Sequence, residues 1–110
     1  MDVSKLLSLM GIARKAGKIK FGYDTVIDSV QKKQAKLIIM ASDLSPRSAR
    51  KIEELAKSNN VEILNISISM DEIYSSIGKK TGIVCINNEG FAEKMIDISK
   101  TYEIGDNKQI

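Results

Sequence analysis

A fully apolar strand and an amphipathic helix meet in residues 35–56, AKLIIMASDLSPRSARKIEELA. Leu37 to Ala41 is a continuous apolar run, which is typical of a strand covered on both faces. Ser45 and Pro46 are residue types favoured at the N-cap and at the first position of a helix. A strand covered on both sides and followed by a helix indicates a layered α/β protein.

The same alternation of helix and strand continues in both directions from this stretch. Apolar residues at helical spacing predict helices over 3–16, from Tyr23 to Val30, over 46–58, over 70–77 and from Asn88 onward. Apolar runs predict strands over 19–21, 37–41, 61–66 and 83–86. Ser69 and Glu72 have the spacing of a capping box, and Tyr74 is expected to pack inward. One helix followed by four strand–helix units predicts an α/β fold with helices on both faces of a four-stranded sheet.

The chain length of 110 residues predicts a single domain, residues 1–104, followed by a frayed tail, residues 105–110. The charges are uneven: residues 1–55 hold 11 of the 17 basic residues and 6 of the 14 acidic ones. This asymmetry points to a polyanionic partner. A charged surface that only keeps the protein soluble is the alternative.

Several kinds of chemistry are excluded by the residue types present. The chain has no histidine and one cysteine, Cys85. Ser-His and Cys-His nucleophile pairs, a disulfide within the chain and a clustered zinc site are therefore excluded. Cys85 lies in an apolar strand pattern, so we expect a buried thiol. The spacing of Gly11, Gly17 and Lys18 does not fit a phosphate-binding P-loop. We expect no catalysis, metal or cofactor.

Membrane and export signals are also missing from the sequence. No apolar run reaches the ~18 residues of a membrane span. Lys5, Arg14 and Lys15 interrupt the first apolar stretch, which is not typical of a signal peptide. We expect a cytoplasmic protein without membrane contact.

A basic segment precedes the second predicted helix. Arg14, Lys15 and Lys18 gather at the exit of the first helix, and Lys20 follows in the short strand. Gly22 then stands directly before the second helix. The N-terminus of a helix attracts anions such as phosphate, and glycine allows close approach of a ligand. We expect a contact with a nucleic-acid backbone here.

Two further surfaces can contact RNA. On the second helix, one polar face lies opposite the core, and such side chains can read base edges. Its residues are Asp24, Thr25, Asp28, Gln31 and Lys32. An ordinary solvated helix face is the alternative. In the turn 66–70, Ile68 and Met70 either cover an unstacked base or belong to the core. The turn with Lys79 and Lys80 can add a phosphate contact.

Three parts of this sequence together resemble a known family. They are the stretch from Leu9 to Lys18, Gly22-x-Asp24, and the stretch from Ala35 to Ser45, with Glu89 to Ala92 also fitting. The combination is similar to bacterial YlxQ-like proteins, which belong to the superfamily of kink-turn RNA-binding large-subunit ribosomal proteins. The resemblance implies a three-layer α/β/α sandwich with a central four-stranded, mixed sheet. It also implies RNA binding.

The resemblance implies binding through the start of the second helix and the turn before the fourth. The Gly-x-Asn-Glu-x-x-Lys motif of kink-turn binders falls on Gly22, Asp24, Thr25 and Asp28, and only the glycine is retained. Tyr23 occupies the variable position, and Ser69 matches a serine of the family's turn. At ~1–3 kcal/mol per base-specific contact, losing two such contacts weakens kink-turn affinity by about tenfold to many thousandfold.

Our first functional hypothesis is a non-catalytic, ribosome-associated protein that binds structured, kink-turn-like RNA. Ribosomal or translation-related proteins are further expected partners. The alternative is a protein-interaction module on the same fold with weakened or lost RNA binding. A small-molecule or nucleotide-binding enzyme on this architecture is a third alternative. The predicted RNA-binding residues are Arg14, Lys15, Lys18, Lys20, Gly22, Tyr23, Asp24, Thr25, Asp28, Lys32, Ile68, Ser69 and Met70.

Overall fold

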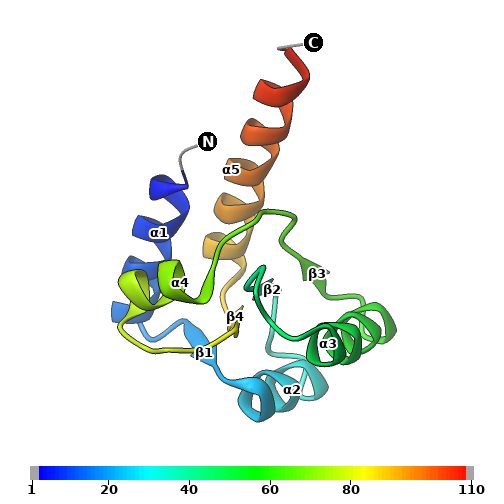
Figure 1. Cartoon of the computed structure of the whole chain (residues 1–110). Coiled ribbons are helices and arrows are strands. Elements are labelled where there is room, and N and C mark those ends of the chain that lie inside the picture. The colour runs from blue at the N-terminus through cyan, green and yellow to red at the C-terminus, as the bar shows by residue number, and fades with distance from the viewer. Residues whose placement is uncertain (1–2, 109–110) are drawn as a thin grey trace.

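A four-stranded mixed sheet forms the centre of the protein (Figure 1). The computed structural model describes the backbone of residues 3–108 and the side chains of residues 3–100. The strands are β1 (Ile19–Phe21), β2 (Leu37–Met40), β3 (Glu62–Ile63) and β4 (Ile83–Ile86), in the order β1-β4-β2-β3. β4 runs antiparallel to both β1 and β2, and β2 runs parallel to β3. The predicted mixed sheet is confirmed.

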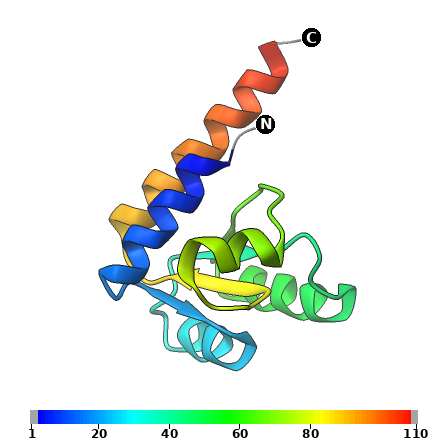
Figure 2. The same cartoon turned by 60° about the vertical axis from the view of Figure 1, so that its left-hand side comes forward.

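Five helices cover the two faces of this sheet. α1 (Ser4–Lys15), α4 (Met70–Ile77) and α5 (Glu89–Lys108) pack on one face. α2 (Tyr23–Gln31) and α3 (Pro46–Ser58) pack on the other. Figure 2 shows α1 and α5 side by side on one side of the sheet, with α2 and α3 beyond its other side. The α/β/α sandwich is therefore confirmed. No helix among the described residues has both the length and the apolar character needed to cross a membrane.

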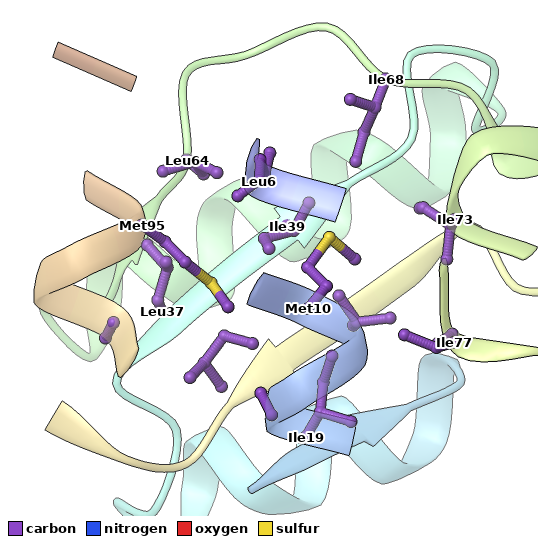
Figure 3. Close-up of a cluster of buried hydrophobic side chains, with 14 of the residues drawn as sticks. Leu6, Met10, Ile19, Leu37, Ile39, Leu64, Ile68, Ile73, Ile77 and Met95 are labelled. Carbon is purple, nitrogen blue, oxygen red and sulfur yellow. The ribbon is translucent and has the colours of Figure 1, made fainter. Parts of the chain in front are cut away.

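The two central strands are buried on both faces, which produces two separate cores. Leu37 and Ile39 of β2 point into the core beneath α1, α4 and α5 (Figure 3). Ile38, between them, and Cys85 of β4 point into the core beneath α2 and α3. All four side chains are fully buried. Because successive strand residues point to opposite faces, a strand that serves both cores must be apolar at every position.

Two expectations about the second half of the chain are wrong. The predicted strand 61–66 forms sheet pairs only at Glu62 and Ile63. Beyond the strand, the Ile66 N–H bonds back to the carbonyl of Leu64, which turns the chain away from the sheet. Tyr74 is 54% exposed, because Ile73 and Ile77 already fill the inward face of α4.

The C-terminal helix is longer than expected. α5 continues through Gly105 to Lys108, residues for which the sequence predicts a frayed tail. A single glycine weakens a helix without ending it. The last two tail positions, 109–110, lie outside the described residues.

The start of α4 is fixed by the predicted capping box. The Ser69 hydroxyl accepts a hydrogen bond from the Glu72 N–H at 3.1 Å. The Glu72 carboxylate accepts one from the Ser69 N–H at 2.9 Å. These bonds satisfy two N–H groups at the helix start, which have no partner within the helix.

We predict that Ser69→Ala lowers the free energy of unfolding by about 1 kcal/mol, because the cap of α4 is lost. Urea denaturation followed by circular dichroism measures this change. Ser67→Ala is the matched control, since Ser67 is exposed and precedes the cap. Equal effects of the two substitutions would contradict the prediction.

Candidate nucleic-acid interface

The start of α2 has an open N-terminus that only glycine can form without strain. Gly22 precedes the helix with φ 96° and ψ 148°, a conformation that L side chains rarely adopt. A Cβ atom placed there would meet no atom within 4 Å. The backbone angle, rather than crowding, therefore requires the glycine. No side chain caps the helix, and its free N–H groups favour a negatively charged ligand.

Backbone hydrogen bonds bring three loops to the same end of the sheet as Gly22. The Gly22 N–H donates to the Ile83 carbonyl at 3.1 Å, and the Ala41 N–H donates to the Gly82 carbonyl at 2.8 Å. The Ser42 N–H donates to the Ile68 carbonyl at 2.7 Å. We call the start of α2 together with loops 41–45, 66–70 and 78–82 the loop rim. It joins both surfaces predicted from the sequence.

The outer face of α2 carries the predicted polar residues. Asp24, Thr25, Asp28 and Lys32 are all exposed. Asp28 forms an ion pair with Lys32 at 3.2 Å, with both side chains more than half exposed. Such an i,i+4 pair stabilises a helix by a few tenths of a kcal/mol. Tyr23 is half-buried against the core beneath α2 and α3. The face thus presents acids and a hydroxyl, with its one cation already paired.

The turn 66–70 differs from its predicted role. Ile68 is 1% exposed and belongs to the core beneath α1, α4 and α5 (Figure 3). Its side chain therefore does not cover a base, and that prediction is wrong. Ser69 is engaged in the capping box. Met70 is half-buried, and its N–H donates to the Asp43 carboxylate at 2.9 Å. The side chains of this turn thus mainly stabilise the fold.

Loop 78–82 supplies the cations of the loop rim. Lys79 and Lys80 are exposed, and the loop begins at Gly78, whose φ is 73°. At its end Gly82 lies so close to Leu44 that a Cβ atom would meet the leucine side chain at 2.7 Å. The sequence predicts a phosphate contact at the two lysines but does not place them beside Gly22. Gly78 and Gly82, which frame the loop, are the sequence feature that indicates a tight turn here.

The basic segment of the sequence is divided by the structure. Arg14 is half-buried, its Nε donates to the Ile77 carbonyl at 3.3 Å, and its guanidinium lies 5.0 Å from the Phe21 ring centroid. Lys79 approaches the same ring at 5.9 Å. Arg14 therefore ties α1 to β1 and to the end of α4.

The other three cations of the basic segment are exposed: Lys15, Lys18 and Lys20. The Lys18 carbonyl accepts from the Asn87 N–H at 2.8 Å, at the end of β1 opposite Gly22. Lys20 lies within β1, an edge strand, two residues before Gly22. Of these three, Lys20 is the nearest to the loop rim along the strand.

A cluster of metal ligands or a reactive cysteine would indicate chemistry beyond RNA contact among the described residues. No cluster of three or more potential metal ligands occurs among them. Cys85 is fully buried, and burial raises the pKa of its thiol. The thiol donates to the Asn87 side-chain oxygen at 3.3 Å. A protonated, buried thiol is a poor nucleophile.

The sequence and the fold match those of known proteins. Residues 4–96 match the Ribosomal protein L7Ae/L30e/S12e/Gadd45 family. RNA-binding protein YlxQ of Bacillus subtilis (strain 168) is 31% identical over 91 residues, which cover 82% of this chain and 90% of the relative. RNA-binding protein YlxQ of Enterococcus faecium is 30% identical over 90 residues, which cover 82% of this chain and 86% of the relative.

Solved structures show the same fold. A protein with unknown function from Bacillus halodurans C superimposes with a TM-score of 0.79 at 24% identity, covering 86% of this chain and 95% of that chain. The Giardia lamblia 15.5kD RNA binding protein superimposes with a TM-score of 0.72 at 18% identity, covering 90% of this chain and 85% of that chain. Both likenesses concern the fold alone.

We predict that Gly22→Ala lowers the free energy of unfolding by about 1–3 kcal/mol, because alanine is strained at φ 96° and ψ 148°. Gly78→Ala is the comparison, since Gly78 lies in the left-handed region that a side chain enters at a cost of about 1–2 kcal/mol. Thermal or urea denaturation measures both. Unchanged stability of Gly22→Ala, with the expected loss in Gly78→Ala, would contradict this interpretation.

Proposed function

Because this chain belongs to the Ribosomal protein L7Ae/L30e/S12e/Gadd45 family, we propose that it is a non-catalytic RNA-binding protein of the cytoplasm that works with ribosomal or other structured RNA. Two relatives that it matches over most of their length are named RNA-binding proteins. The loop rim is the proposed binding surface. Its geometry and charge support this function independently of the names.

The observation that carries the proposal is the hydrogen bond between the Gly22 N–H and the Ile83 carbonyl. It holds the positive end of α2 beside loop 78–82, with its exposed Lys79 and Lys80. A helix N-terminus and two lysines together favour the closely spaced phosphates of an RNA backbone. The open space around Gly22 lets a backbone approach the helix end closely.

The outer face of α2 then determines which RNA is preferred. Asp24 and Thr25, in the first turn, can accept hydrogen bonds from base amino groups, and the threonine hydroxyl can also donate. One turn later, Asp28 pairs with Lys32 and leaves no free cation there. We infer a preference for kink-turn-like RNA, with lower affinity than a protein that carries a cation at position 28.

We predict that Lys79→Ala/Lys80→Ala weakens binding to a kink-turn RNA and reduces its salt dependence. Each lost phosphate contact lowers the slope of log affinity against log salt by about 0.7–0.9. Fluorescence anisotropy at several salt concentrations measures this slope. The matched control is Lys51→Ala/Lys57→Ala, which removes two exposed lysines of α3. Equal losses of slope in the two variants would place the RNA outside the loop rim.

We further predict that Asp28→Lys strengthens binding to the same RNA by about three- to tenfold. The change removes an anion near the phosphates and frees Lys32 from its ion pair. Asp28→Asn, which removes the anion without adding a cation, should have a smaller effect in the same direction. No change in either variant would mean that α2 does not contact the RNA.

A protein-interaction module remains the alternative on this fold. The acids of α2 motivate it, because they replace residues that the resemblance assigns to RNA contact. Titration of the unmodified protein with kink-turn RNA, ribosomal RNA fragments and a scrambled duplex separates the two functions. Binding that weakens with salt supports the RNA-binding function. Absent or salt-independent binding supports the interaction module.

A further inference from the structure

A groove runs between α1 and α5, on elements that the proposed RNA surface does not use. Figures 1 and 2 show the two helices side by side, with the C-terminal part of α5 extending beyond the first turn of α1. The groove is shallow and open to solvent, with a volume of about 350 Å³. Both of its walls are helical, so a third helix can lie along them in ordinary helix packing.

The floor of this groove is apolar and open. Ile12 of α1 is 56% exposed, which makes it one of two exposed large hydrophobic side chains among the described residues. Leu9 of the same helix and Ile98 of α5 line the groove beside it and are half-buried against the core. An exposed apolar strip bordered by polar residues is typical of an interaction surface. RNA phosphates gain nothing from such a floor, whereas the apolar side chains of a protein do.

The rim of the groove is positively charged. Lys5 of α1 and Lys94 of α5 line it from opposite walls. Among the described residues that line the groove there is no acidic side chain.

These features together define the occupant. We infer that the α1–α5 groove binds an acidic amphipathic helix of a partner protein. Its apolar face would contact Leu9, Ile12 and Ile98, and its flanking carboxylates would pair with Lys5 and Lys94. Apolar anchors at helical spacing in a groove supply affinity, and opposite charges at the rim supply orientation and selectivity. This function is separate from RNA binding and compatible with it.

The experiment uses the full chain and two synthetic helical peptides of equal length. Both peptides carry the same leucine face, flanked by glutamates in one and by lysines in the other. Fluorescence anisotropy measures binding, and NMR amide shifts locate the contact. We expect the glutamate peptide to bind at least tenfold more tightly than the lysine peptide, with shifts at Leu9, Ile12 and Ile98.

Two variants test the apolar and charged parts separately. Ile12→Glu should weaken binding of the glutamate peptide at least tenfold. Tyr74→Glu should not, although Tyr74 is the other exposed large hydrophobic side chain among the described residues. Lys5→Glu/Lys94→Glu should reverse the preference between the two peptides. Circular dichroism checks that each variant folds.

Several results would overturn the inference. If neither peptide binds, or if both bind with equal affinity, the inference is contradicted. An unchanged affinity of Ile12→Glu, or NMR amide shifts outside the groove, also contradicts it. Sedimentation that reveals a dimer abolished by Ile12→Glu would assign the groove to a second copy of this chain. If kink-turn RNA displaces the bound peptide, and Lys5→Glu/Lys94→Glu weakens the binding of that RNA, the groove would be assigned to RNA. Loss of RNA binding alone, with peptide binding intact, would affect only the function proposed for the loop rim.

Discussion

The antiparallel pairing of β4 with both of its neighbours is the constraint on which the rest of the structure depends. Because β1 and β2 run opposite to β4, both end where β4 begins. β3 is parallel to β2, so the chain leaves β3 at that same end. The start of α2 and three loops must therefore gather there. The candidate interface is a direct consequence of strand direction.

The elements themselves could be predicted from local patterns in the sequence, whereas their neighbours in space could not. The apolar run from Leu37 to Met40 and the cap at Ser45 each depend on residues close in the chain. The order β1-β4-β2-β3 depends on pairings between distant segments, which periodicity does not contain. That is why the sequence indicated Gly22 and Lys79 separately and did not place them on one rim.

The errors at the candidate site have the same physical origin. For Ile68 the sequence left base contact and burial in the core as alternatives, and the hydrogen bond from the Ser42 N–H to its carbonyl holds the turn against the sheet, where the side chain is buried. Arg14 looked like a free cation, but Phe21 and the Ile77 carbonyl engage it. Both outcomes depend on contacts made across long sequence separations. The capping box at Ser69 was predictable because both of its partners lie within one turn.

The buried thiol in the central strand has a consequence for the motion of the protein. Cys85 is the only cysteine of the chain and is fully covered by the core beneath α2 and α3. A thiol-specific reagent can reach it only when that layer separates from the sheet. The rate of its modification therefore reports how often the layer that carries α2 opens, without any added label. The protein carries its own probe for local opening at the helix proposed to contact RNA.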